Sequence, residues 1–551
     1  MAPHQVDNPA FEIDFSGVVV GAESAKEKED SPNVAVKVDE NNNNNNIEET
    51  PSEADTVSSQ HRPLKSGRQL FRWNLLFNLL IWTVVPLPLW LPFVTSHYAL
   101  FILPAIQLIF VAFWVTIAML ALKNVAILYW ERETAFREKY TNLLEVQKLE
   151  HLFVISCYKE PLELIFRSVD TIAAQTEAHR INMTVSFEER TPSKEEKTKA
   201  LEARYTSQFR LFMVTVHPFG QENEIPGKCS NANYGIRQSV ECLKSLKGSE
   251  FDAENIIVTT CDADSSFHSK YAEALTLKFL TTDQKHRSVF QAPLFYNWNL
   301  DSCSVVTRVT SLLRSTLMLG ALIPLNINSM SIFSFSLKLC IQGNFVHPGY
   351  QMDDIIALIR WMGVTKSSLK IKMIPVPAIS GPTSGRVIEE EVEEWARQAR
   401  RWTIGAGEVF HYFMVKMRNI PFFTSLGWGL VFIFYYGILL CTSGLYGFSF
   451  TISMFAILRN TPLWLHLAGA AMLAVQYLCF SVAFLVDFMA KNLMKDKVEE
   501  RICFVRNLFH FIMTPFVLLG YSFVEFFALH EVAVRGKKVC KHGASKKDNL
   551  V

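Results

Sequence analysis

The chain has 551 residues, 49% of them hydrophobic, and a formal net charge of +1 at pH 7. This length suggests several domains, and a charge so close to zero argues against binding of nucleic acid through bulk charge. The ten cysteines include no C-x-x-C pair, so neither a zinc site nor a disulfide framework is indicated. The pattern fits a reducing compartment for the soluble part.

Residues 1–66 are polar and contain an uninterrupted run of asparagines at positions 41–46. Such a segment cannot bury a hydrophobic core, so we expect a disordered N-terminal tail. No apolar stretch follows Met1, so the sequence predicts no signal peptide.

Two apolar runs follow, at 75–94 and 99–122. Each is close to the roughly 20 residues that cross a bilayer core, and membrane helices tolerate the prolines of the first run. We therefore expect a transmembrane helical hairpin over 67–123. Basic residues at both of its ends (Arg68, Arg72 and Lys123) predict that both flanks face the cytosol.

Residues 124–150 read as a charged connector, and residues 151–405 have the composition of a soluble domain. Short apolar runs at 152–156, 209–216, 256–260 and 288–291 predict strands, with helices expected between them at 162–175, 271–280 and 305–319. Alternating strands and helices predict a mostly parallel α/β sheet. The segment 186–206 is rich in Glu and Lys and predicts a surface insertion.

The chain becomes apolar again beyond residue 421. The runs 422–441, 463–488 and 507–529 each predict a membrane span, and 445–458 is either a fourth helix or an interfacial one. This gives a C-terminal transmembrane region at 406–530, followed by a basic tail at 531–551. Pro515 and Gly520 favour a re-entrant hairpin in the last run, which would leave both flanking basic stretches in the cytosol.

The predicted strand at 256–260 leads into Asp262 and Asp264, two carboxylates one residue apart. Open α/β sheets bind ligands at the carboxyl ends of their strands. Two close carboxylates are costly without a cation, which predicts Mg²⁺ or Mn²⁺ with open positions for phosphate oxygens. The alternative is a solvated turn. His268 is a candidate additional ligand.

Two segments before this strand carry further candidates. Glu160 follows the predicted strand at 152–156 and could accept hydrogen bonds from a base or ribose; alternatively it is a turn acid before a proline. Lys228 opens a probable helix that also contains Asn233, and a lysine beside helix N-terminal N–H groups is an anion site. The alternative is a solvated lysine at a helix cap.

Two segments after the strand complete the set. Asp353 and Asp354 lead into a predicted helix, where they are either a general base near a sugar hydroxyl or acids favoured by the helix dipole. Gln398, Arg401 and Trp402 share one face of a helix at i, i+3 and i+4. An arginine fork suits a diphosphate and tryptophan offers a platform for a sugar, unless this is a membrane-anchoring amphipathic helix.

In this order the segments resemble the membrane-embedded branch of family 2 glycosyltransferases, which includes cellulose, chitin and hyaluronan synthases. That family carries a strand-end acidic motif, Lys-x-x-x-x-Asn, Asp-x-Asp, a Thr-Glu-Asp-like motif and Gln-x-x-Arg-Trp. The chain departs from it in two ways. The Thr-Glu-Asp position reads Met352-Asp353-Asp354, which leaves Asp353 as an alternative base, and the gating loop expected after Gln-x-x-Arg-Trp has no clear match.

The resemblance implies a GT-A fold inserted between transmembrane helices of a multi-pass protein, and an inverting hexosyl transfer. It assigns the nucleotide to Glu160, Lys228, Asn233, Asp262 and Arg401, and the Mg²⁺ or Mn²⁺ to Asp262 and Asp264. Asp354 would be the base. Gln398 and Trp402 would line the acceptor site.

The expected partners are a nucleotide-sugar donor, with a UDP-sugar favoured, a glycan or lipid-linked acceptor, and the lipid bilayer, with no nucleic acid. Processive polysaccharide synthesis stays open. A dolichyl-phosphate-type single-sugar transferase is one alternative, although that branch typically lacks Gln-x-x-Arg-Trp. An inactive scaffold or transporter is another. The catalytic domain is expected in the cytosol, at the plasma membrane or at the Golgi or ER.

Overall fold

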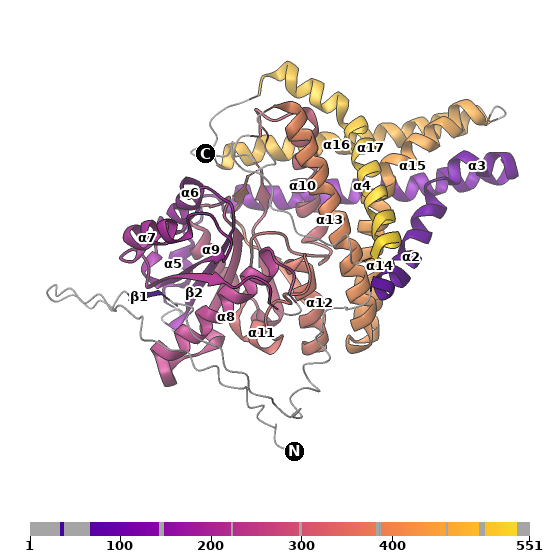
Figure 1. Ribbon diagram of the computed structural model, residues 1–551. Helices are drawn as coiled ribbons and strands as arrows, with labels where there is room; N and C mark the ends of the chain where they lie inside the picture. Colours follow the sequence, from indigo (N-terminus) through magenta and orange to yellow (C-terminus); the bar gives the residue numbers. More distant parts are fainter. Residues whose placement is uncertain are drawn as a thin grey trace.

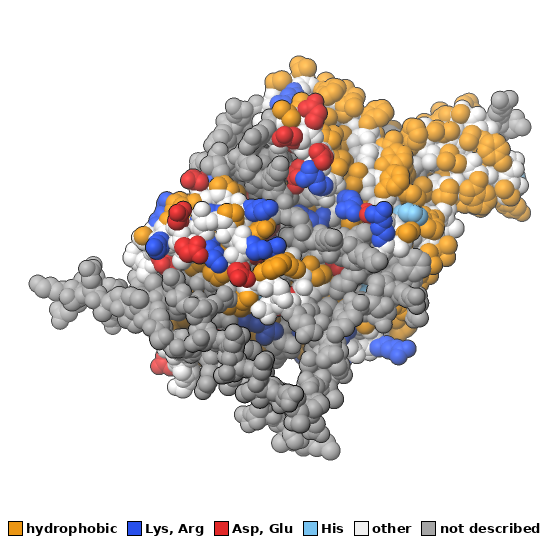
Figure 2. All heavy atoms as spheres, in the orientation of Figure 1, with side chains coloured by type: hydrophobic (Ala, Val, Ile, Leu, Met, Phe, Trp, Pro, Cys, Tyr) orange, Lys and Arg blue, Asp and Glu red, His pale blue; other side chains and the backbone are white. Residues whose placement is uncertain are grey.

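The structure is a computed structural model that describes residues 34–37, 67–142, 148–221, 224–296, 300–381, 385, 387–458, 461–494 and 502–536. A sheet domain lies on one side and a group of long helices on the other (Figure 1). Hydrophobic side chains gather over the helices farthest from the sheet, and charged side chains are most frequent over the sheet domain (Figure 2). This division matches the alternation of polar and apolar stretches along the chain.

The main sheet has eight strands in the order β1-β4-β3-β2-β5-β9-β7-β10. Neighbouring strands are parallel except for β9, which runs antiparallel to both β5 and β7. The predicted mostly parallel α/β sheet is therefore confirmed. In sheet order the strands are Val34–Lys37, Leu211–His217, Ile181–Glu188, Glu150–Cys157, Ile256–Asp262, Phe333–Ser336, Ser288–Gln291 and Lys370–Met373.

Two strands differ from the expectations. β1 lies inside the segment 1–66, whose other residues are outside the described part of the chain. β3 was not predicted, because Asn182, Thr184 and Ser186 interrupt its apolar pattern. All three are buried and hydrogen-bonded. Asn182 Nδ2 donates to Glu150 Oε2 at 3.1 Å, and the hydroxyls of Thr184 and Ser186 bond to Ser239 and Asn231 of helix α8 (Lys228–Lys247).

Helices cover both faces of the sheet. Their bounds are α6 Leu162–Ala173, α7 Lys194–Tyr205, α8 Lys228–Lys247, α9 Tyr271–Leu280, α11 Leu337–Gln342 and α12 Asp353–Thr365. Helix α7 occupies the segment predicted to be a surface insertion, and it buries Leu201 and Tyr205 against the domain. A small second sheet, ordered β6-β11-β8, consists of Ser265–Phe267, Ala378–Ser380 and Leu294–Phe295.

Within the described residues, five helices are long and apolar enough to cross a membrane, or six if a bent pair counts as one span. The bent pair lies within α2 (Gly67–Val84) and α3 (Leu87–Val94), which meet at 58°, and α4 (Ser96–Glu131) follows. Helix α4 runs into the predicted connector, where α5 (Phe136–Tyr140) succeeds it. These helices occupy the N-terminal region in which the sequence predicts a hairpin.

The C-terminal candidates are the stretch Phe422–Ile457, α16 (Leu463–Leu493) and α17 (Phe504–Arg535). The first contains α14 (Phe422–Phe432), the π-helical Ile433–Leu440 and α15 (Cys441–Ile452), so 445–458 continues the preceding helix instead of forming a separate one. The fifth candidate lies at Val305–Leu322, within the predicted soluble domain. It comprises α10 (Val305–Leu317) and a π-helical turn, and 83% of it is buried.

The predicted re-entrant hairpin at 507–529 is wrong, because α17 is one continuous helix. Pro515 lacks an N–H, so the carbonyl of Phe511 loses its helical donor. The hydroxyl of Tyr477 on α16 donates to that carbonyl at 3.2 Å. A neighbouring helix thus satisfies the freed carbonyl, as membrane helices with prolines require.

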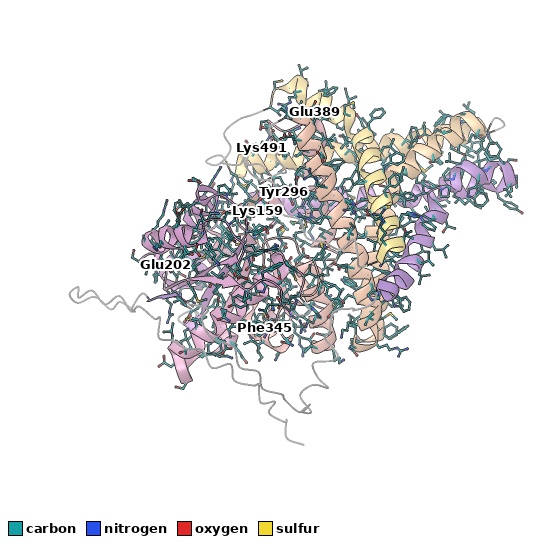
Figure 3. All side chains as sticks on the ribbon, in the orientation of Figure 1. Lys159, Glu202, Tyr296, Phe345, Glu389 and Lys491 are labelled. Carbon is teal, nitrogen blue, oxygen red and sulfur yellow. The ribbon has the colours of Figure 1, made fainter. Side chains whose placement is uncertain are left out.

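A buried ion-pair cluster joins the sheet domain to the membrane helices. Arg308 of α10 lies 3.2 Å from Asp301 and 3.1 Å from Asp487 of α16, and Lys491 lies 2.6 Å from Asp301. All four side chains are at most 9% exposed. Since removing one member would leave a buried charge unpaired, the cluster holds α10 firmly against α16. Figure 3 labels Lys491 near the upper end of the molecule.

Candidate functional site

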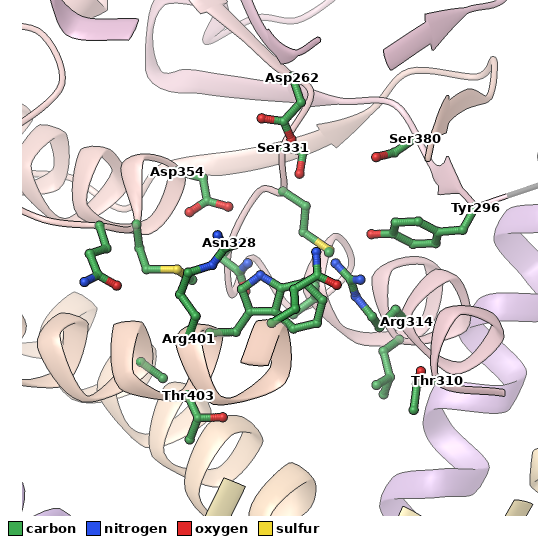
Figure 4. A pocket seen from close by; sticks show the side chains of 18 of the residues that line it. Asp262, Tyr296, Thr310, Arg314, Asn328, Ser331, Asp354, Ser380, Arg401 and Thr403 are labelled. Carbon is green, nitrogen blue, oxygen red and sulfur yellow. The ribbon is translucent and has the colours of Figure 1, made fainter. Parts of the chain in front are cut away.

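A cavity of about 270 Å³ lies between the carboxyl ends of the central strands and the helices α10, α12 and α13 (Ile388–Lys416). Segments of the chain between Trp114 and Glu525 contribute to its wall. Nine of the eleven candidate residues from the sequence line it, and these are Glu160, Lys228, Asp262, Asp264, Asp353, Asp354, Gln398, Arg401 and Trp402. Figure 4 shows Asp262, Asp354 and Arg401 facing the same space.

Lys228 is the first residue of α8 and lies among three acids. Its ammonium nitrogen is 3.0 Å from Asp262 Oδ1 and 3.6 Å from Asp353 Oδ2, and it donates to the carbonyl of Ser331 at 3.3 Å. Burial alone would lower the pKa of Lys228, but the coulombic effect of Asp262, Asp353 and Asp354 raises it above its usual range. Lys228 is therefore a fixed cation of the site.

Asp353 and Asp354 open α12 and are 6% and 8% exposed. The backbone N–H of Ile355 donates to Asp354 Oδ1 at 2.8 Å. Burial raises the pKa of both carboxyls; the charge of Asp353 raises that of Asp354 further, whereas Lys228 opposes the shift. A carboxylate with a raised pKa is a better proton acceptor, which suits a general base.

The close approach of α13 to α12 depends on Gly405. A Cβ atom at this position would lie 2.5 Å from Cγ of Met352, the residue that precedes Asp353. A side chain at this position would have to displace the side chain of Met352. The small residue therefore allows the Gln-x-x-Arg-Trp helix to face the two acids.

The residues at the end of β5 fit a divalent cation. Asp262 and Asp264 both line the cavity, and Asp264 is only 2% exposed. Among the described residues no group of three His, Cys, Asp or Glu side chains could hold a metal ion. His268 does not line the cavity, and its Nδ1 accepts from the N–H of Lys270. Two carboxylates suit Mg²⁺ or Mn²⁺, which fills its other positions with water and substrate phosphates.

Like His268, the predicted site residue Asn233 does not line the cavity, whereas Asn231 does. Residues two apart on a helix point in nearly opposite directions. Asn231 Nδ2 donates to the carbonyls of Cys157 and Ser186 at 3.2 and 2.8 Å, which ties α8 to the ends of β2 and β3. Asn233 instead accepts from Arg237 at 3.4 Å.

The part of the cavity wall that contains Glu160 holds a second acid, Glu188, which was not predicted from the sequence. Glu160 Oε2 accepts from the N–H of Tyr158 at 2.6 Å, and Glu188 lies nearby at the end of β3, 7% exposed. Burial raises the pKa of Glu188, and Arg190 at 3.6 Å opposes this. Because β3 itself was not predicted, nothing in the sequence marked Glu188 as a strand-end acid.

Arg401 and Trp402 face the cavity from α13, together with Gln398. Burial lowers the pKa of Arg401, while the coulombic effect of Asp262 raises it. Trp402 carries the guanidinium of Arg314 over its ring at 3.7 Å. Arg314 belongs to α10 and was not singled out from the sequence, because only the folded chain brings it to Trp402.

The cavity continues between the membrane helices. Tyr435, Tyr436 and Ser443 line it from the Phe422–Ile457 stretch, and Tyr521 and Glu525 line it from α17. Glu525 is 4% exposed. An acid buried within a membrane segment is costly and usually marks a functional site. This part of the wall offers aromatic rings and hydroxyls to a polar ligand.

No family model matches the sequence, and no curated protein matches it either. Among solved structures, the chain is similar to a mannosyltransferase, PcManGT from Pyrobaculum calidifontis, in complex with GDP-Man and Mn²⁺. The two are 11% identical over 70% of this chain and 99% of the other, with a TM-score of 0.38. S. aureus TarS 1–349 is 10% identical over 62% of this chain and 92% of its own, with a TM-score of 0.29.

A third similar structure is glucosyl-3-phosphoglycerate synthase from Mycobacterium tuberculosis, in complex with Mn²⁺, uridine diphosphate and phosphoglyceric acid. It is 13% identical over 50% of this chain and 81% of its own, with a TM-score of 0.29.

Proposed function

We propose that the protein is a membrane-bound, metal-dependent, inverting glycosyltransferase that moves a sugar from a nucleotide-sugar donor to an acceptor hydroxyl. One observation carries this proposal. Glu160, Lys228, Asp262, Asp354 and Arg401 come from five separate segments of the chain, and all line one cavity at the carboxyl edge of the sheet. Ligands of open α/β sheets bind at that edge.

The donor would lie with its nucleoside toward Glu160 and Glu188, whose carboxylates accept hydrogen bonds from ribose or base. Its diphosphate would lie between Asp262 and Arg401. Mg²⁺ or Mn²⁺ held by Asp262 and Asp264 would neutralise charge on the diphosphate when bound. The planar fork of Arg401 matches phosphate oxygens.

Asp354 would act as the base in a single displacement. The acceptor hydroxyl passes its proton to the Asp354 carboxylate as its oxygen forms a bond to the anomeric carbon. The bond from that carbon to the phosphate oxygen breaks, and its electron pair leaves with the nucleoside diphosphate. Attack from the face opposite the leaving group inverts the anomeric configuration. Lys228 and Arg401 offset the negative charge that gathers in the cavity.

The acceptor would enter from the membrane side of the cavity. Gln398 and Trp402 line the cavity from α13, and Tyr436, Tyr521 and Glu525 extend its wall between the helices. Aromatic rings and hydrogen-bonding groups suit a glycan or the sugar of a lipid-linked acceptor. The proposal therefore includes polysaccharide extension as well as single transfer.

The test is release of nucleoside diphosphate by the detergent-solubilised protein, incubated with a panel of nucleotide sugars and Mn²⁺. We expect release from one donor class, and release that is about 10²- to 10⁴-fold slower from the Asp354→Asn variant. A folded wild-type protein that releases no diphosphate from any donor, with and without glycan acceptors, contradicts the proposal. It would favour a scaffold or transporter instead.

A further inference from the structure

Arg314 of α10 lies between two aromatic rings in the cavity (Figure 4). Its guanidinium carbon is 3.7 Å from the centroid of the Trp402 ring and 4.5 Å from that of Tyr296. Stacking occupies the faces of a guanidinium and leaves its N–H edges available for a planar anion. The two rings therefore hold the guanidinium of Arg314 in the cavity wall, with its N–H edges available to a ligand.

Arg314 differs from the other cations of this region in having no acidic partner. Among the described residues, no carboxylate forms an ion pair with it. Lys228 lies 3.0 Å from Asp262, and Arg308, six residues earlier on the same helix, pairs with Asp301 and Asp487. A cation in a partly desolvated cavity is costly without a counter-charge. The site is thus built for an anionic ligand.

The position of that ligand follows from the neighbours of Arg314. Arg314 lies 3.7 Å over the ring of Trp402, the residue that follows Arg401, and both arginines line the same cavity. Two neighbouring guanidinium groups repel each other, and an anion that lies between them offsets this repulsion. Tyr296, whose ring lies 4.5 Å from the guanidinium of Arg314, lines the cavity together with Asp262 and Asp264. The anion would therefore lie beside the proposed metal ligands.

We infer that Arg314 binds the diphosphate of the nucleotide-sugar donor together with Arg401, as a second arginine for the leaving group. This inference rests on the proposed function. As the bond between the anomeric carbon and the phosphate oxygen breaks, the electron pair moves to that oxygen. The N–H edges of Arg314 meet the charge that develops there, while the acceptor proton stays with Asp354.

The experiment compares nucleotides that differ by one phosphate. Binding of UDP and UMP, each with Mn²⁺, is measured by calorimetry on purified wild-type protein, Arg314→Gln and Arg314→Lys. Losing a hydrogen-bonding group to a charged partner weakens binding roughly 10- to 100-fold. We expect this loss for UDP with Arg314→Gln and little change for UMP. Arg314→Lys should recover only part of it, because lysine lacks the planar fork.

Arg204 provides a matched control. It also stacks on two rings, 4.6 Å from Phe166 and 5.4 Å from Tyr205, but it pairs with Asp170 and lies outside the cavity. Arg204→Gln should leave both affinities unchanged. Inorganic pyrophosphate with Mn²⁺ repeats the comparison without a nucleoside.

The outcomes separate the inference from the proposed function. If wild-type protein binds UDP or pyrophosphate but folded Arg314→Gln binds them equally well, the role of Arg314 is wrong and the proposed function stands. An equal loss for UDP and UMP also overturns it, because Arg314 would then act only by shaping the cavity. Wild-type protein that binds neither compound contradicts both.

Discussion

The ammonium nitrogen of Lys228 lies 3.0 Å from Oδ1 of Asp262, and the same nitrogen lies 3.6 Å from Asp353. The lysine opens α8, Asp262 ends β5 and Asp353 opens α12. One cation therefore joins the proposed metal ligands to the proposed base. This link predicts how the empty site and the metal-bound site differ in stability.

Lys228→Gln should destabilise the metal-free protein by roughly 1–3 kcal/mol, because the acids lose their shared cation. Added Mn²⁺ should then raise the melting temperature of the variant more than that of the wild type, since the ion replaces the missing charge. Lys244→Gln, on the same helix, breaks only the exposed pair with Glu241 and should change little. An equal Mn²⁺ effect on wild type and Lys228→Gln would contradict this account.

Asp354→Asn should bind donor normally but transfer sugar about 10²- to 10⁴-fold more slowly, because the acceptor hydroxyl loses its base. Single-turnover transfer and nucleotide binding are measured on the same preparation. Asp353→Asn is the comparison variant, because it removes a carboxylate that pairs with Lys228 but leaves the proposed base in place. If Asp353→Asn is the slower variant, the two roles must be exchanged.

The rate of transfer should rise with pH through the pKa of Asp354, because only the ionised carboxylate accepts a proton. Burial raises that pKa above its ordinary value of 3.8, and the charge of Asp353 raises it further. As the pH is lowered, the transfer rate should therefore begin to fall at a higher pH than it would with an exposed aspartate as the base. Asp353→Asn removes the negative neighbour of Asp354, so the acidic limb of the pH–rate profile of this variant should move to lower pH. A limb that stays in place, or moves upward, would argue against Asp354 as the base.

Asp264→Ala should abolish the effect of a chelator on donor binding. In the wild type, removal of the divalent ion should weaken binding because the diphosphate loses its cation. In the variant, binding should already be weak and insensitive to chelator. Asp283→Ala, in an exposed turn, is the control. Chelator sensitivity equal to that of wild type would move the metal site elsewhere.

The C-terminus should lie on the same side of the membrane as the sheet domain. Near the start of α17, Arg506 donates to the carbonyl of Asp301 at 2.7 Å, and near its end Glu531 pairs with Arg400 of α13 at 2.6 Å. Asp301 and Arg400 both belong to the part between the two groups of membrane helices, and α17 lies beside α13 (Figure 1). If α17 lies in the plane of the membrane surface, the basic stretches before and after it both stay in the cytosol without a hairpin.

Protease protection on sealed vesicles tests this arrangement, with one tag in the exposed turn at 192–193 and another at the C-terminus. We expect both tags to be cleaved from the cytosolic side. Protection of the C-terminal tag alone would mean that α17 crosses the bilayer. Asn182-Met183-Thr184 has the sequence of a glycosylation site, but Asn182 is 1% exposed within β3, so the absence of a glycan there would not show which side of the membrane the domain faces.

The sequence predicted those site residues whose position follows from local structure. Asp262 ends an apolar strand, Asp353 and Asp354 begin a helix, and Gln398, Arg401 and Trp402 share a helical face. Each of these relations depends on neighbours within a few residues, so the pattern alone was enough.

The remaining features depend on contacts between distant segments. Glu188 was missed because its strand carries polar residues that only partners such as Ser239 and Asn231 satisfy. Arg314 acquires its place from Trp402, 88 positions later in the chain. Pro515 suggested a break in the last apolar run, but the hydroxyl of Tyr477 donates to the carbonyl that this proline leaves without a helical donor. None of these pairings leaves a periodic signal in the sequence.

The central claim is that the cavity binds the donor, and the most direct test is an experimental structure of the full chain with UDP and Mn²⁺. The account predicts the metal between Asp262, Asp264 and the diphosphate, the diphosphate beside Arg401, and the nucleoside toward Glu160 and Glu188. Nucleotide bound at another place under saturating conditions, with this cavity lacking it, would contradict the account.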